Sequence, residues 1–156
     1  MNGLLVIDMQ EEYVGTKRNK KRYPYDTQSL ISKINERIRQ YPEESVIYIV
    51  NKFFGEIGKT PKVYVNGLDI VSRNSYMKRK SSAFSDVKLL EYLQRMNITS
   101  LELVGVDGNY CVAKTALDGI KKGFDIKCNE HCIGICNQAK FTRTRMTLLK
   151  KGVQFI

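Results

Sequence analysis

The sequence predicts an α/β protein, a three-layer α/β/α sandwich around a mostly parallel, Rossmann-like sheet of about six strands. Short, continuously apolar runs alternate along the chain with longer segments of helical periodicity. The apolar runs lack polar alternation, which is typical of strands covered on both faces of a parallel sheet. The chain has 156 residues, 42% of them hydrophobic, which suits one sizeable core. We therefore expect residues 1–156 to form a single domain, with right-handed crossovers that place helices on both faces.

Six runs of strand length punctuate the chain. The first, G-L-L-V-I, and the second, S-V-I-Y-I-V, are almost entirely apolar. The third is short and delivers Lys78 at its end, and the sixth is expected at the edge of the sheet. The expected strands are residues 3–7, 45–50, 74–77, 100–106, 124–128 and 153–156.

Between these strands, apolar side chains recur every three or four residues, as they do on the buried face of a helix. Asp26 or Thr27 is suited to cap the first helix, and Gly123 is suited to end the third. The loops at residues 9–25 and 51–73 show no period, and the second is long enough to cover a substrate pocket. The expected helices are residues 26–41, 86–96, 110–122 and 138–151.

Basic residues exceed acidic ones, which gives a formal net charge of +10. The densest run is K-R-N-K-K-R at residues 17–22, followed by Tyr23 and Tyr25. Such a run is found both in solvated loops and in sites for nucleic acid or another polyanion. The other basic residues are scattered along the sequence. We therefore favour a solvated surface, and we do not expect nucleic acid as a partner.

No apolar run has the length of a membrane span, and the N-terminus lacks a basic region before a long apolar run and a cleavage site. We expect a cytoplasmic protein with no membrane partner, in which the four cysteines are thiols. Three of these, Cys128, Cys132 and Cys136, surround His131. Because their spacing is not that of a zinc knuckle, we prefer packing as small hydrophobes to a metal cluster.

Chemically reactive side chains follow three of the expected strands. Asp8 follows the first strand, Lys78 follows the third, and Cys111 begins the helix after the fourth. The carboxyl ends of parallel strands lie at one edge of the sheet, where open α/β proteins bind ligands. The three residues are therefore expected to converge. Taken alone, Asp8 would be equally suited to cap a helix or to form a turn.

Cys111 is the candidate nucleophile. It is expected at a helix N-terminus, where partial positive charge favours a thiolate and free N–H groups can hold an oxyanion. A free thiol has a pKa near ~8.5, so it needs a base or a nearby cation. His131 is one candidate base. We prefer Asp8, because desolvation behind an apolar strand raises the pKa of a carboxylate, with Lys78 as the neighbouring cation.

Three motifs occur in order along the chain: L-L-V-I-D-M-Q near the N-terminus, K-R-K-S-S-A-F in the middle, and V-G-V-D-G-N-Y-C-V. Each motif is modest alone, but the three together at this spacing are fairly specific. They resemble the isochorismatase-like cysteine hydrolases, a family that includes nicotinamidases, N-carbamoylsarcosine amidase and related small-amide hydrolases. The resemblance covers nearly the whole chain.

The resemblance implies a catalytic triad. Asp8 matches the aspartate of the family, and Cys111 matches its nucleophilic cysteine. The lysine of the family stands four residues before the serine of S-A-F, which is Ser82 here, so that lysine is Lys78. Lys80 is the alternative if the alignment slips by two residues. The resemblance also implies an assembly of several identical subunits.

The resemblance further implies a cis peptide between Val106 and Asp107. The N–H groups of Asp107 and Cys111 would then form the oxyanion hole. Three aromatic residues near the motifs are candidates for lining the substrate pocket, although ordinary packing explains them equally well. They are Tyr13, Phe84 and Tyr110.

Departures from the family pattern narrow the range of reactions that we expect. The segment after the second strand, N-K-F-F-G-E-I-G-K-T, has no histidine, so we expect no nicotinamidase-type metal site and no cofactor. True isochorismatases lack the nucleophilic cysteine, so hydrolysis of a small amide or ureido substrate through a thioester is favoured over vinyl-ether cleavage. Asp107 and Gly108 replace the small and hydroxyl residues that the family commonly has in the loop before Cys111.

The alternative functions are a catalytically silent family member and a basic polyanion-binding module at residues 17–25.

Overall fold

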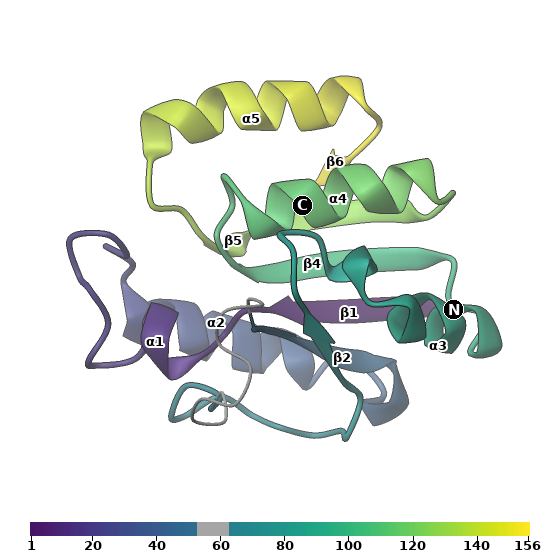
Figure 1. Cartoon of the computed structure of the whole chain (residues 1–156), viewed down its shortest axis with the longest axis horizontal. Coiled ribbons are helices and arrows are strands. Elements are labelled where there is room, and N and C mark those ends of the chain that lie inside the picture. Colours follow the sequence, from purple (N-terminus) through teal and green to yellow (C-terminus); the bar gives the residue numbers. More distant parts are fainter. Residues whose placement is uncertain (53–62) are drawn as a thin grey trace.

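The computed structural model describes residues 1–52 and 63–156, and its centre is a parallel sheet in the order β3-β2-β1-β4-β5-β6 (Figure 1). The expected α/β/α sandwich with a parallel sheet is confirmed. All six expected strands are present, and the first of them lies beside the fourth at the middle of the sheet. The strands are β1 (Asn2–Ile7), β2 (Val46–Asn51), β3 (Ser75–Lys78), β4 (Ser100–Val106), β5 (Asp125–Gly134) and β6 (Gln154–Phe155).

Helices cover both faces of this sheet (Figure 1). Successive side chains of β1 point to opposite faces, so its continuous apolar run supplies two cores. Leu4 and Val6 pack with the helix α2, whereas Leu5 and Ile7 pack with α3, α4 and α5. Each fully buried aliphatic side chain contributes about 1.5–3 kcal/mol. The helices are α1 (Glu11–Val14), α2 (Thr27–Ile38), α3 (Val87–Arg95), α4 (Cys111–Lys121) and α5 (Gln138–Lys150), with 3-10 turns at Glu43–Ser45 and Ala83–Ser85.

β5 is longer than expected, since it runs to Gly134 rather than ending at residue 128. The strand continues because its register against β4 shifts between Leu103 and Gly105. β6 pairs with residues 127–128 of β5, and the Glu130 N–H donates to the Ile156 carbonyl, so the strand beyond Glu130 is an edge that tolerates polar side chains. Cys128 and Cys132 are therefore buried strand residues, as packing of small hydrophobes requires, and Cys132 lies beyond the expected end of the strand at residue 128.

The two expected loops also contain some structure. The short helix α1 interrupts the 9–25 loop. Part of the 51–73 stretch, residues 53–62, lies outside the described residues. Beyond it, Tyr64 pairs with Gln10 in an antiparallel bridge, so this end of the long loop lies directly after β1. In the described ranges, none of the helices combines the length and the apolar character that a bilayer crossing requires.

Candidate active site

Asp8, Lys78 and Cys111 meet at one edge of the sheet. The Lys78 Nζ lies 2.9 Å from the Asp8 Oδ2 and 3.3 Å from the Cys111 Sγ. Asp8 follows β1, Lys78 ends β3, and Cys111 is the first residue of α4, which follows β4. Because every strand of the sheet is parallel, the residues that follow these strands share an edge, and side chains far apart in sequence come within contact distance.

Local backbone geometry turns Asp8 out of the sheet. Its φ is 53°, in the left-handed region that aspartate tolerates better than most residues. The neighbouring strand has Gly105 with a φ of 110°, and a Cβ there would lie 2.1 Å from the Ile7 carbonyl oxygen. Only glycine lets β4 approach β1 this closely. The V-G-V segment of the third motif therefore has a packing role directly beneath the site.

The site is almost closed to solvent. Lys78 has no exposed surface and Asp8 is 2% exposed, whereas Cys111 is partly exposed. A fully buried lysine is tolerated because it is paired with a carboxylate. The second Asp8 oxygen, Oδ1, has no hydrogen-bond partner in residues 1–52 and 63–156. It is a buried acceptor at the point where a thiol or a substrate has to lose a proton.

Burial governs the protonation of the pair. Burial raises the pKa of Asp8 above 3.8, although the charge of Lys78 opposes the shift. Burial, followed by the negative charge of Asp8, raises the pKa of the Cys111 thiol to about 12. The sequence led us to expect a thiolate favoured by the helix N-terminus and by Lys78, and the raised pKa of Cys111 runs against that effect. Desolvation and the nearby carboxylate both act in the direction opposite to Lys78.

The loop before Cys111 is held by the side chain of Asp107. The Val106–Asp107 peptide is cis, as the resemblance implied. The Asp107 Oδ2 accepts hydrogen bonds from the Tyr25 hydroxyl at 2.8 Å and from the Cys136 N–H at 2.6 Å, and its Oδ1 accepts one from the Asn109 N–H at 2.7 Å. The Asp107 carboxylate is thus bound by one donor in its own loop, Asn109, and by two donors from distant segments, Tyr25 and Cys136.

The N-terminus of α4 lacks a side-chain cap, because the side chain of Tyr110, at the capping position, accepts no hydrogen bond from the first turn of the helix. The N–H of Cys111, at the first helical position, has no partner within the helix. It is therefore free to donate to an anionic oxygen bound next to the Cys111 sulfur.

Asn51 and Gln10 belong to this edge, although the sequence analysis did not single them out. Asn51 ends β2, opposite Lys78 in register, and its Nδ2 donates to the Tyr13 hydroxyl at 2.8 Å. Both polar atoms of the Gln10 side chain bond to the Asn51 backbone, at 2.7 Å and 3.2 Å. The Asn51 Oδ1 is buried without a partner in the described part of the chain. In the sequence, the position of Asn51 directly after an apolar run was the feature that could have identified it.

The remaining candidates lie in different places. Tyr13 is held at the sheet edge by Asn51. Phe84 and Tyr110 line a groove bordered by α4 and α5, together with Lys80, and the lining of that groove includes none of the triad residues. His131, the other candidate base, is exposed on β5, whereas the Cys111 sulfur is in contact with Lys78. Within the described residues, no group of three or more His, Cys, Asp or Glu side chains is arranged to hold a metal ion, and all four cysteines are free thiols.

Comparisons with known proteins agree with this fold. PnC1 from L. infantum, solved in complex with nicotinate, superposes with a TM-score of 0.83 at 19% identity, over 100% of this chain and 92% of that one. The pyrazinamidase/nicotinamidase from Streptococcus mutans UA159 gives 0.77 at 18% identity and 100% of both chains. An isochorismatase-like hydrolase from Alkaliphilus metalliredigens gives 0.77 at 20%, over 99% and 92%. No curated protein matches the sequence.

At these identities the solved structures establish the fold alone. The family assignment comes from the sequence itself, in which residues 2–155 match the model of the isochorismatase domain. That match spans the parallel sheet from β1 to β6 together with the helices on both of its faces. On this evidence the chain belongs to the isochorismatase-like hydrolase family.

Proposed function

We propose that this protein is a cysteine hydrolase of a small amide or ureido substrate, with Asp8, Lys78 and Cys111 as its catalytic triad. The observation that carries the proposal is the position of the Lys78 Nζ, 2.9 Å from Asp8 and 3.3 Å from Cys111. A buried base, a buried cation and a nucleophile are thereby in mutual contact, an arrangement suited to covalent catalysis.

In the first half of the reaction, Asp8 takes the proton of the Cys111 thiol as the sulfur attacks the substrate carbonyl carbon. Burial and the charge of Asp8 raise the pKa of the thiol, and we propose that its proton moves to Asp8 during the attack. The carbonyl oxygen becomes an oxyanion held by the N–H groups of Asp107 and Cys111. Protonated Asp8 then gives its proton to the departing amine nitrogen as the C–N bond breaks, which leaves a thioester on Cys111.

In the second half, Asp8 takes a proton from water while the water oxygen attacks the thioester carbon. The C–S bond breaks, the acid product leaves, and Asp8 returns the proton to the Cys111 sulfur. Lys78 offsets the negative charge that alternates between the Asp8 carboxylate and the sulfur.

The substrate is expected to carry N–H donors. Two buried acceptors at this edge, the Asp8 Oδ1 and the Asn51 Oδ1, lack partners within the described residues, and a primary amide or a ureido group supplies matching donors. Tyr13, fixed by Asn51, is the aromatic wall that we propose beside the acyl group. Phe84 and Tyr110 are retained as substrate contacts of lower priority, because both line the neighbouring groove.

The test is a screen of small primary amides and ureido acids for release of ammonia, with Cys111→Ala as the inactive variant. Cys136→Ala is the matched control, because Cys136 is also a partly exposed thiol but has no contact with Lys78 or Asp8. We expect Cys111→Ala to lose turnover and Cys136→Ala to keep it. A mass increase equal to the acyl group, located on Cys111 after rapid quenching, identifies the thioester. Retention of turnover by Cys111→Ala would refute the proposal.

A further inference from the structure

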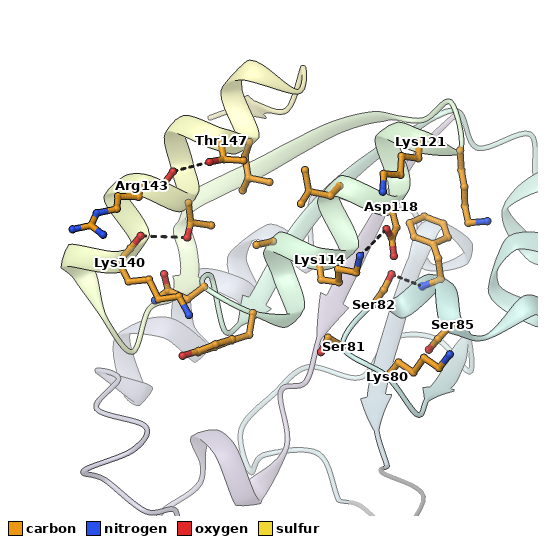
Figure 2. A pocket seen from close by; sticks show the side chains of 18 residues that line it. Lys80, Ser81, Ser82, Ser85, Lys114, Asp118, Lys121, Lys140, Arg143 and Thr147 are labelled. Carbon is orange, nitrogen blue, oxygen red and sulfur yellow. Dashed lines mark hydrogen bonds and ion pairs between the residues drawn. The ribbon is translucent and has the colours of Figure 1, made fainter.

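A second feature of the molecule is a groove of about 1140 Å³ between α4, α5 and the segment around Ser82. Figure 2 shows Lys114, Asp118 and Lys121 along α4, Lys140 and Arg143 on α5, and Lys80 on the third wall. The apolar floor includes Leu117 and Leu148. None of Asp8, Lys78 and Cys111 lines this groove.

The groove carries a strong positive charge. Its lining contains six cations, which are Lys80, Lys114, Lys121, Lys122, Lys140 and Arg143. Asp118 is the one acidic residue of the lining, and it pairs with Lys114 at 3.3 Å. Within residues 1–52 and 63–156, none of the other five cations has a carboxylate within ion-pair distance. Five uncompensated charges in one hollow create a potential that attracts anions.

These charges are spread along the groove rather than gathered at one point. The wall supplied by α4 extends from Tyr110 to Lys122, about 18 Å along the helix axis at 1.5 Å per residue. Lys140 lies at one end, 4.0 Å from the centre of the Tyr110 ring, and Lys121 and Lys122 lie at the other. A single phosphate would use only part of such a row, whereas an extended polyanion would use all of it.

An exposed aromatic ring accompanies the cations. Tyr110 is 51% exposed, and Lys140 packs over its ring. Side-chain hydroxyls of Ser81 and Ser85 also line the groove and are suited to phosphate oxygens. A basic groove with an accessible aromatic ring is the combination that binds single-stranded nucleic acid, because bases stack on the ring while cations follow the backbone. We propose that the groove between α4 and α5 binds single-stranded nucleic acid.

The sequence alone did not lead to this proposal, because the six cations come from three separated segments and only the fold brings them together. A second copy of this chain is a poor occupant, since its net charge of +10 would oppose approach to a basic groove. The basic run at residues 17–22 is not part of the groove lining. It therefore provides a matched control for a general effect of positive charge.

The test measures binding of the full-length protein to a fluorescein-labelled oligo(dT) of about 12 nucleotides by anisotropy, over a range of salt concentrations. The groove variant is Lys121→Gln with Arg143→Gln, one cation from each helix wall. We expect its affinity to fall at least tenfold and its logarithmic salt slope to decrease by about 1.4, since each phosphate contact to a single strand contributes about 0.7. The control variant, Lys20→Gln with Lys21→Gln, has the same change in charge and should bind like the unmodified protein.

Tyr110→Ala separates a nucleic acid from a simple polyanion. Loss of stacking should weaken oligo(dT) at least about fivefold, while competition by inorganic polyphosphate stays unchanged. All substituted side chains are exposed, and circular dichroism checks that each variant is folded. The proposal is overturned if the groove and control variants lose affinity equally, if the groove variant binds normally, or if Tyr110→Ala weakens oligo(dT) and polyphosphate to the same extent. Cys111→Ala should bind oligo(dT) normally, so the result is independent of the proposed hydrolase activity.

Discussion

The hydroxyl of Tyr25 donates a 2.8 Å hydrogen bond to the carboxylate of Asp107 across 82 residues of sequence. This contact joins the loop before α2 to the turn that precedes Cys111. The same carboxylate accepts from the N–H groups of Asn109 and Cys136. Asp107 therefore fixes the shape of the turn whose N–H we propose as one donor of the oxyanion hole.

Tyr25→Phe removes one of these three donors and leaves the ring in place. We expect kcat to fall about tenfold with little change in KM, because a hydrogen bond to a charged acceptor contributes about 1.5–3 kcal/mol to the order of the turn. Steady-state kinetics with the substrate found in the screen would measure this. Tyr92→Phe is the control, since its hydroxyl bonds to the Glu44 carbonyl and its loss should leave kcat unchanged. Equal effects of the two variants would contradict a positioning role for Tyr25.

Asp8→Asn should have opposite effects on thiol reactivity and on turnover. The negative charge of Asp8 helps to raise the pKa of Cys111 to about 12, so its removal should speed alkylation of Cys111 by iodoacetamide at pH 7. Turnover should fall by about 10²–10⁴, because the general base is lost. Peptide mass spectrometry follows both Cys111 and Cys136 in one sample. Slower labelling of Cys111 in this variant would show instead that Asp8 activates the resting thiol.

The acid limb of the activity profile should report Asp8. Its pKa is raised above 3.8 by burial and held down by Lys78, and only the ionised carboxylate accepts the thiol proton. Activity should therefore fall as the pH decreases through this raised pKa. Lys78→Met removes the cation, so the residual activity should show an acid limb at higher pH than in the unmodified enzyme. An unchanged or lower midpoint in kcat/KM against pH would argue against the contact between Lys78 and Asp8.

Outside the site, the pair of Arg37 and Glu102 should control stability at low pH. Burial alone would raise the pKa of Glu102, but hydrogen bonds from Arg37, Asn129 and Tyr41 outweigh it and lower that pKa below 4.5. The stabilisation is therefore complete above pH 4.5 and is lost as the pH falls through the lowered pKa. Arg37→Met should cost about 3 kcal/mol at pH 7, because it leaves the buried carboxylate without its main partner. Urea unfolding at pH 7 and pH 3 measures both effects, and the difference between the two proteins should shrink at pH 3.

The alternation of apolar runs and helical periods was enough to predict the layers and the parallel sheet. Strands such as β1 are apolar on both faces, and few other arrangements bury both. The length of β5 was not predictable, because Asn129 and Glu130 are ordinary loop residues by composition. They are tolerated in a strand here because Asn129 donates to Glu102 and Glu130 pairs with Arg145.

The convergence of Asp8, Lys78 and Cys111 followed from strand ends alone, and the contacts of Lys78 with the other two residues agree with it. The raised pKa of the Cys111 thiol did not follow from the sequence. Local sequence indicates a helix N-terminus and a nearby lysine, whereas burial depends on every element packed around the sulfur. The hydrogen bonds of Asp107 could not be predicted either, because its partners Tyr25 and Cys136 come from distant segments.

Lys78 is the one lysine among the described residues that is fully buried. Acylating reagents that modify accessible amines should therefore mark the other described lysines of the folded protein and spare this one. Its protection depends on β1, β3 and α4 being docked together, and it disappears when they separate. Chemical footprinting of a single amine would thus report the integrity of the reaction centre directly, without a substrate, and would show whether an inactive variant has lost chemistry or assembly.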